Sequence, residues 1–366
     1  MAHNILFRPL RLGAIELPHR VIMAPLTRMR SGVGGTPTPL NVEYYAQRAS
    51  AGLIFTEDTT ISRQAQGYPS VPGIFTPTQI LGWRAVTDAV HAHGGRIVMQ
   101  IAHNGRNSHS SFMLSGELPV APSAIPPTGQ AHKPNFKPVD YETPRALETR
   151  ELPEIVAAFR EAALNAMDAG FDGVSVQGTN GQLLEQFLED GTNRRTDAYG
   201  GGIENRARLL LDVVDAVSGA IGAERVGVRL SPYGQFGGIS DSDPQGLFTY
   251  VIRQLSERRI AYLHLIEARG SEIGLSDELH VGAVNNAALF RSFFDGPLIS
   301  AAAYTPESAA TTVEGGYADA IAFGRLFIAN PDLPERIQRN APLNSPNRAT
   351  FYGGGAEGYT DYPSLP

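Results

Sequence analysis

The stretch Asp319-Ala320-Ile321-Ala322-Phe323-Gly324-Arg325 decides the fold of this chain. Its apolar part is too short for a helix and is stopped by a glycine and a cation, which is typical of a buried strand that opens onto an anion site. The preceding apolar run, Pro297–Ala301, also ends in small residues. A parallel barrel builds a phosphate site from its last two loops. We therefore predict a bound cofactor that carries a phosphate group.

Short apolar runs of this kind alternate with amphipathic segments along the whole chain. The expected strands are Val21–Leu26, Leu53–Glu57, Arg96–Ile101, Gly173–Val176, Val226–Leu230, Tyr262–Ile266, Pro297–Ala301 and Ala320–Phe323. The expected helices include Thr78–His93, Glu151–Ala169, Asn205–Ile221 and Asp243–Arg258. This alternation indicates parallel strands joined by helical crossovers, and eight strands close a barrel. The prediction is an α/β fold, a single (β/α)8 TIM barrel over residues 1–366.

The alternative is an open, doubly wound sheet. A nucleotide-binding protein of that kind normally carries G-x-G-x-x-G after its first strand. Here Met23-Ala24-Pro25-Leu26-Thr27-Arg28 stands at that place. The barrel is therefore favoured.

Two segments depart from the alternation. Residues 103–149, after the third strand, hold many Pro, Ser and His residues without a sustained period. Long loops in compact domains are usually functional, so we expect a lid over the strand ends. Residues 341–366 end in a Gly- and Pro-rich tail and are expected to wrap over the surface.

The composition excludes several classes of protein. The 366 residues are 42% hydrophobic and 18% charged, as in globular proteins, and the net charge of -7 argues against nucleic-acid binding. The absence of cysteine excludes disulfides and thiolate chemistry. No apolar run has the length of a signal peptide core or a membrane span. We expect a cytoplasmic enzyme with a small-molecule substrate, no metal and no membrane partner, as a monomer or small homo-oligomer.

Polar residues follow the expected strands at the barrel face where chemistry occurs. They are Thr27, Glu57, Asp58, Gln100, Gln177, Asn180 and, within the fifth strand, Arg229. A buried arginine needs an acceptor, which is either a carboxylate inside the barrel or a cofactor oxygen. Gln100 is either a satisfied core amide or a cofactor ligand.

Several longer motifs resemble one family. They are Met23–Arg28, Gly67-Tyr68-Pro69, Asn193–Asp197 with Tyr199-Gly200-Gly201, Glu204–Arg208, Ala322–Arg325, Ala329–Leu333 and Phe351–Tyr362. The chain resembles the old yellow enzymes, flavin-dependent ene reductases, and is most similar to the pentaerythritol tetranitrate and N-ethylmaleimide reductase branch. The match runs over nearly the whole chain.

The resemblance implies non-covalent FMN, reduced by NADH or NADPH, and hydride transfer to an alkene activated by a carbonyl or nitro group. It places Thr27 and Gln100 at the flavin pyrimidine edge, Arg229 at N1/O2, and Ala24 and Pro25 near the ring. By the same resemblance, Ala302, Gly324 and Arg325 hold the phosphate, while Tyr68 and Tyr352 border the substrate.

The departures from the family pattern concern the catalytic positions. Gln177 and Asn180 stand where the family has a His-x-x-His or His-x-x-Asn pair, and Gln182 replaces the tyrosine that supplies a proton. Amides can polarise a substrate oxygen but are not useful general acids near neutral pH. The open alternatives are reduction without this donor, a flavin-dependent isomerase or desaturase, and a flavin-binding protein with little turnover.

Two further departures concern the pocket. Ala102 stands where this branch has a tryptophan, and Asp58 where a small apolar residue is common. Asp58 either contacts the flavin or faces away and pairs with an arginine.

Other groups are discounted as sites. His91 and His93 face apart, and His103 and His109 are expected to have solvent-exposed polar roles in the lid. Asp241-Ser242-Asp243 lacks the spacing of a calcium loop, and Gly353–Gly355 lacks a following Lys-Ser/Thr. Glu185 and Glu189 are expected on a solvated helix face.

Overall fold

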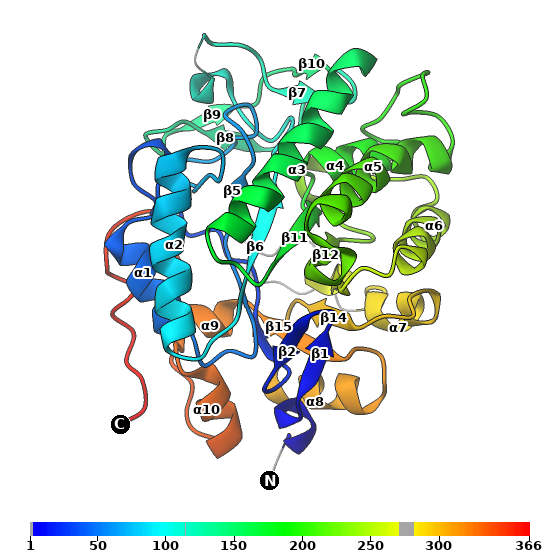
Figure 1. Cartoon of the computed structure of the whole chain (residues 1–366). Helices are drawn as coiled ribbons and strands as arrows, with labels where there is room; N and C mark the ends of the chain where they lie inside the picture. Colours follow the sequence, from blue (N-terminus) through cyan, green and yellow to red (C-terminus); the bar gives the residue numbers. More distant parts are fainter. Residues whose placement is uncertain (1–2, 114, 271–281) are drawn as a thin grey trace.

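A computed structural model describes residues 3–113, 115–270 and 282–366. Its main sheet runs β11-β12-β13-β14-β15-β3-β4-β6, and β11 also pairs with β6, so that eight parallel strands close into a barrel (Figure 1). The strands are β3 Val21–Met23, β4 Ile54–Phe55, β6 Ile97–Ala102, β11 Gly173–Gly178, β12 Val226–Leu230, β13 Tyr262–Ile266, β14 Leu298–Ala301 and β15 Ala320–Phe323. The predicted (β/α)8 TIM barrel is confirmed. A two-residue strand, β5 Thr59–Thr60, pairs with β6 beside the barrel.

Helices surround the barrel as the sequence periodicity indicates. They are α1 Pro39–Ala46, α2 Pro77–Ala92, α3 Leu152–Asp168, α4 Leu183–Leu188, α5 Ile203–Ile221, α6 Pro244–Glu257, α7 Asn286–Phe290, α8 Pro306–Glu314, α9 Arg325–Ala329 and α10 Leu333–Arg339. Helix α2 begins sharply because Thr76 and Gln79 form a capping box and Pro77 follows the cap. Strand β3 ends before the predicted Leu26, because Pro25 has no N–H to continue the ladder.

The strands have two buried faces. The outer face, with residues such as Val176 and Val228, shares one core cluster with helix residues such as Leu210 of α5. The inner face belongs to a second cluster that includes Ile22, Phe55, Tyr262 and Ile299. The barrel is therefore a filled core, and ligands can be held only at its ends.

A hairpin that we did not predict closes one end of the barrel. Strands β1 Leu10–Leu12 and β2 Ile15–Leu17 pair antiparallel. Their apolar side chains join the inner core cluster. The hairpin lies at the end of the barrel opposite to β7–β10 (Figure 1). Binding is thereby directed to the other end, where the strands terminate.

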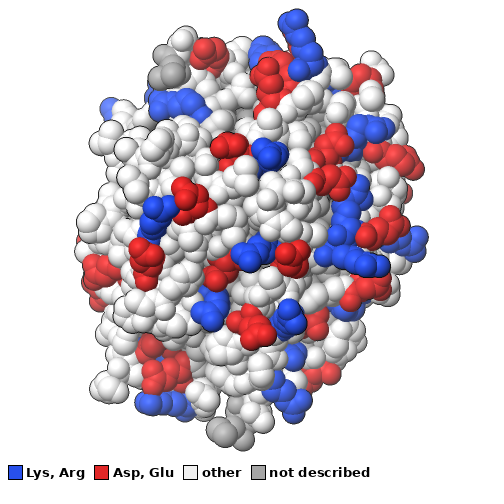
Figure 2. Space-filling model, in the orientation of Figure 1, with Lys and Arg blue, Asp and Glu red and all other residues white. Residues whose placement is uncertain are grey.

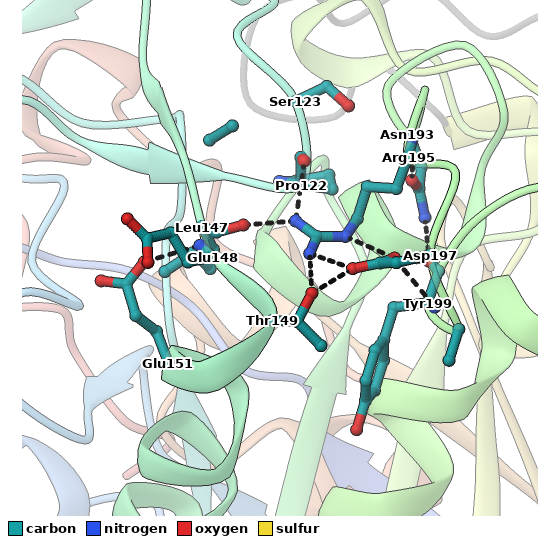
Figure 3. A network of polar contacts seen from close by, with 12 residues as sticks. Pro122, Ser123, Leu147, Glu148, Thr149, Glu151, Asn193, Arg195, Asp197 and Tyr199 are labelled. Carbon is teal, nitrogen blue, oxygen red and sulfur yellow. Dashed lines mark hydrogen bonds and ion pairs between the residues drawn. The ribbon is translucent and has the colours of Figure 1, made fainter.

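The segment 103–149 contains short strands rather than unpatterned loop. Strands β8 Gln130–His132 and β9 Pro138–Asp140 form a hairpin, and β7 Val120–Ala121 pairs with β10 Arg145–Ala146. Arg195 fastens the base of the segment: its guanidinium donates to the carbonyls of Pro122, at 3.2 Å, and Leu147 (Figure 3). Its ion pair with Asp197 lowers the pKa of that carboxyl. The lid role of the segment stays a prediction.

The C-terminal tail is held more deeply than a surface wrap. Tyr359 is fully buried and stacks on Tyr44 of α1, with ring centroids 4.0 Å apart. Three buried arginines donate to tail carbonyls: Arg28 to Phe351 and Gly358, Arg30 to Thr350, and Arg48 to Tyr359. The tail is therefore part of the wall at this side of the barrel.

Charges of both signs are interspersed over the face seen in Figure 2. Within the described ranges, none of the helices combines the length and the apolar content needed to cross a bilayer. The same residues contain no group of three or more His, Asp or Glu side chains arranged to hold a metal ion.

Candidate active site

One cavity of about 250 Å³ lies at the ends of β3, β14 and β15 and is completed by the C-terminal tail. It brings together most of the residues expected at the cofactor. The predicted residues that line it are Ala24, Pro25, Thr27, Asn180, Arg229, Ala302, Gly324, Arg325 and Tyr352. Residues from both ends of the chain thus meet at one mouth of the barrel.

The part of the cavity after β14 and β15 has the features of an anion site. Ala302 and Ala303 both have positive φ, 94° and 57°, which is costly for residues with a Cβ and concentrates at ligand sites. Gly324 precedes Arg325, the first residue of α9, and both line the cavity. A guanidinium beside exposed backbone at a strand end suits a phosphate dianion. These residues fit the phosphate of FMN.

Arg229 presents a donor without an acceptor. Its Nη1 lies 3.5 Å from the side-chain oxygen of Gln100, while its Nε is buried and has no partner among the described residues. Burial lowers the pKa of Arg229 to about 10, and the nearby Asp58 opposes this. No ion pair with a carboxylate joins Arg229 in the described part of the chain, so the internal salt bridge is not what the structure holds. A flavin oxygen would satisfy the free N–H.

Asp58 is the centre of a cluster of glutamines beside this arginine. The side-chain nitrogens of Gln100, Gln177 and Gln182 all donate to its carboxylate, that of Gln177 at 3.3 Å. Asp58 is buried, and this burial raises the pKa of its carboxyl. The hydrogen bond from Gln182 and the charge of Arg229 lower that pKa, but by less. The interpretation that Asp58 faces away and pairs with an arginine is wrong, because the amides draw the carboxylate inward. Gln100 also lies 3.5 Å from Arg229 through its side-chain oxygen, and its role at the flavin stays a prediction.

The turn after β11 carries the residues that replace the family's catalytic pair. Asn180 and Gly181 have positive φ, and Gln182 is the N-cap residue of α4. The Glu185 carboxylate accepts from the Gly181 N–H at 2.6 Å and from the Ser231 hydroxyl. That hydroxyl accepts in turn from the Asn180 N–H at 3.2 Å. Glu185 therefore fixes the turn.

The expectation that Glu185 and Glu189 lie on a solvated helix face is wrong. Both are buried, 0% and 2% exposed, because all six residues of α4 pack into the rim of the barrel. Burial raises the pKa of Glu185 to about 7. Burial also raises the pKa of Glu189, and the neighbouring Glu185 adds to the effect. The spacing of four residues between Glu185 and Glu189 indicates a helix, but it does not reveal whether that face of the helix is covered by other parts of the protein.

His103 is also buried, 1% exposed, so its expected solvent-exposed role is wrong. Burial lowers its pKa to about 3, and its Nδ1 accepts from the Gly105 N–H at 3.0 Å. Ala102 lies beside it at the end of β6, fully buried and paired with Thr60. The start of segment 103–149 is therefore part of the packed core.

Tyr68 lies within electrostatic range of Asp58 and of two tyrosines from other segments. Burial raises the pKa of Tyr68 well above its ordinary value, and Tyr141, Asp58 and Tyr352 are close enough to add to it. Tyr352 lines the cavity. Sequence reasoning missed Tyr141, because nothing in the pattern of 103–149 indicates which of its residues return to the strand ends. The tyrosines connect the glutamine cluster to the cavity.

Comparison with known proteins agrees with this geometry. Residues 5–344 match the model of the NADH:flavin oxidoreductase / NADH oxidase family. The chain is 48% identical to flavin oxidoreductase hxnT of Emericella nidulans, over 98% of this chain and 97% of that protein. It is 45% identical to 12-oxophytodienoate reductase 1 of Oryza sativa subsp. japonica, over 98% and 93%.

Solved structures give the same result. Morphinone reductase superimposes with a TM-score of 0.93 at 47% identity, covering 98% of this chain and 96% of that chain. The old yellow enzyme homologue from Zymomonas mobilis superimposes with a TM-score of 0.94 at 43% identity, covering 98% and 99%. The chain therefore belongs to the NADH:flavin oxidoreductase / NADH oxidase family, as an FMN-dependent oxidoreductase of the old yellow enzyme type that takes its electrons from a nicotinamide.

Proposed function

We propose that this enzyme reduces an activated double bond by hydride transfer and does so without a side-chain acid at the usual position. FMN supplies the chemistry of hydride transfer, with NADH or NADPH as its reductant. The family supports the reduction of activated alkenes in general. The absence of the acid is inferred from Gln182 of this chain.

The state of Gln182 is the observation that carries the proposal. This side chain is buried, its nitrogen donates to Asp58, and its oxygen has no partner among the described residues. An amide has no proton with a pKa matched to neutral pH. Proton delivery at the substrate must therefore come from water or be unnecessary. The loss of a general acid slows a reaction by about 10²–10⁴-fold without preventing hydride transfer.

The remaining residues have binding and orienting roles in this proposal. Arg229 binds the N1/O2 edge of the flavin, where negative charge grows on reduction. Thr27 hydrogen-bonds the O4 side. Ala302, Gly324 and Arg325 hold the phosphate, with Ala24 and Pro25 against the ring. Gln177 and Asn180 contact the substrate.

The missing acid also favours a second candidate, a flavin-dependent isomerase or desaturase. In such a reaction hydride moves without a coupled protonation at residue 182. Product analysis distinguishes the two candidates, because an isomerase consumes no net NADPH and a desaturase reduces its own flavin.

The first experiment is anaerobic mixing of the yellow holoenzyme with NADPH or NADH in a stopped-flow spectrometer. We expect the flavin absorbance to bleach, and cyclohexenone to restore it slowly. A flavin that neither nicotinamide reduces would contradict the proposal and leave a flavin-binding protein with little turnover.

A further inference from the structure

The glutamine cluster, Asp58 with Gln100, Gln177 and Gln182, has a definite polarity. All three amides direct their N–H groups at the carboxylate. The reverse orientation would place amide oxygens against carboxylate oxygens, which repel each other. The oxygens of Gln177 and Gln182 are consequently turned away from Asp58, and both are buried with no partner among the described residues. The cluster offers acceptors rather than donors.

This orientation of the amides does not suit the binding of a carbonyl group. A carbonyl or nitro oxygen needs N–H or O–H donors. Here residues 177 and 182 each donate one N–H to Asp58, and it is their amide oxygens that have no partner among the described residues. An acceptor atom placed against these two oxygens would be repelled by them. A positively charged or donor-bearing ligand would satisfy the same atoms.

The cluster lies beside residues that line the cavity, although its own four residues are not part of the lining. Gln177 is paired in register with Arg229, so both lie in the same layer of the barrel, and Arg229 lines the cavity. Tyr352 also lines the cavity. Both Tyr352 and Asp58 are close enough to Tyr68 to raise the pKa of its phenol. Gln177, which donates to the carboxylate, is therefore the neighbour of a residue in the cavity wall.

The tyrosines add a second feature that favours cations. Tyr68 follows β5, Tyr141 belongs to segment 103–149 and Tyr352 to the tail, and the last two both lie within electrostatic range of Tyr68. Aromatic faces around an anionic group are the means by which proteins bind organic cations. The phenol groups also add no fixed positive charge that would repel such a ligand.

Asp58 lacks a committed counter-charge. It forms no ion pair with a Lys, Arg or His among residues 3–113, 115–270 and 282–366, and Arg229 is the cation that acts on it. In the proposed function Arg229 serves the flavin edge. Arg229 therefore offsets the charge of the buried carboxylate without an ion pair, and a cationic ligand in direct contact would lower the cost of this burial further.

We propose that the substrate is an organic cation and that its reducible group is an iminium, C=N⁺, with Asp58 as the counter-charge. This inference rests on the proposed function and names the substrate class. The iminium carbon accepts hydride to form a C–H bond, the π pair of C=N becomes the nitrogen lone pair, and a neutral amine results. NAD(P)H supplies the two electrons through the flavin. No proton is required, which matches a site with Gln182 in place of an acid.

Calorimetric binding to the oxidised holoenzyme tests the charge preference. The probes are an N-methyl dihydroisoquinolinium cation and its all-carbon isostere, a methyl dihydronaphthalene. We expect the cation to bind at least about tenfold more tightly, as an opposite charge at close range implies. Asp58→Asn should abolish the preference, while Glu357→Gln, which removes an exposed carboxylate of the tail, should keep it. Equal affinities, or a preference unchanged in Asp58→Asn, would overturn the inference.

A second variant guards against failure of Asp58→Asn to fold. Tyr141 is only partly buried, so Tyr141→Leu should be tolerated. It should weaken cation binding several-fold and leave the isostere nearly unaffected. An equal loss for both probes would show that the ring contributes only contact area and would count against the cation site.

The inference and the proposed function fail separately. NADPH bleaching of the flavin without substrate tests the function alone. Bleaching with no preference for the cation removes the inference and leaves the function. Selective binding of the cation without bleaching of the flavin removes the proposed function and leaves the cation site. Conversion of the iminium to its amine, with one NADPH consumed for each amine formed, supports both.

Discussion

The backbone N–H of Gly181 donates a 2.6 Å hydrogen bond to the buried carboxylate of Glu185. This bond holds the turn that carries Asn180 and Gln182. Glu185 is thus a positioning residue for the candidate active site, although it lines no part of the main cavity.

Removal of Glu185 should loosen the turn. We expect Glu185→Ala to lower the free energy of unfolding by about 2–4 kcal/mol, because the Gly181 N–H and the Ser231 hydroxyl lose their acceptor. Glu185→Gln keeps an acceptor and should cost less. Urea denaturation measures both, with Glu161→Ala on the exposed face of α3 as the control. A loss of equal size in Glu161→Ala would contradict the assignment.

The buried carboxyl of Glu57 predicts a pH dependence of stability. It accepts from the backbone N–H groups of Arg28 and Met29, at 2.9 and 3.1 Å, and burial raises its pKa from 4.5 to about 7. The folded state therefore holds the proton more tightly than the unfolded state. The stabilisation from this group is complete below about pH 4.5 and is lost as the pH rises through about 7.

The Glu57→Gln variant isolates this contribution. We expect the free energy of unfolding of the native chain to fall relative to that of the variant between about pH 4.5 and about pH 8, by up to about 3 kcal/mol. Denaturant titrations of both proteins across this range provide the measurement. A constant difference would mean that Glu57 has no raised pKa in the folded state.

Restoring the acid should improve enone reduction. Gln182→Tyr places a phenol where the family has one, and Asp58→Ala in the same chain removes the carboxylate that now binds Gln182. We expect the double variant to reduce cyclohexenone on the order of 10²-fold faster than the native enzyme. Gln182→Phe with Asp58→Ala is the matched control and should show no such gain. An unchanged or slower rate would refute the role assigned to position 182.

Arg229 and Arg325 should have separable effects on the flavin. Arg229→Ala should lower the flavin reduction potential by roughly 30–60 mV, equivalent to about 1.4–2.8 kcal/mol, because a charged hydrogen bond to the reduced form is lost. Arg325→Ala should weaken FMN binding by roughly tenfold or more and leave the potential unchanged, since it removes a phosphate contact. Spectroelectrochemistry and FMN titration measure the two quantities.

An exposed arginine provides the control for this pair. Arg150, with 83% of its side chain accessible, should affect neither quantity when changed to alanine. Full FMN occupancy and an unshifted potential in Arg229→Ala would remove Arg229 from the flavin edge.

The barrel could be predicted from the sequence because its signals are local. Each strand is a short apolar run, and the capping box at Thr76 and Gln79 marks a helix start that needs no tertiary information. The residues lining the cavity followed from the strand ends, since parallel strands finish at one face. The hairpin of β1 and β2 escaped notice because its strands are only three residues long.

The environments of single polar groups could not be predicted in the same way. Glu185 looks like a surface carboxylate in the sequence, and only the packing of α4 buries it. Asp58 is predicted at a strand end, but its three glutamine partners could not be read from the sequence. Tyr141 is separated from Tyr68 by α2, the third strand and most of segment 103–149, so no spacing rule connects them. Such contacts depend on how loops return over the barrel.

The tail has a consequence for how the enzyme matures. Phe351 and Tyr352 form part of the cavity wall, and Tyr359 ties that wall to α1. A nascent chain still attached to the ribosome before these residues emerge has a barrel without a finished pocket. The binding site for the vitamin-derived coenzyme is therefore complete only after this segment has been translated.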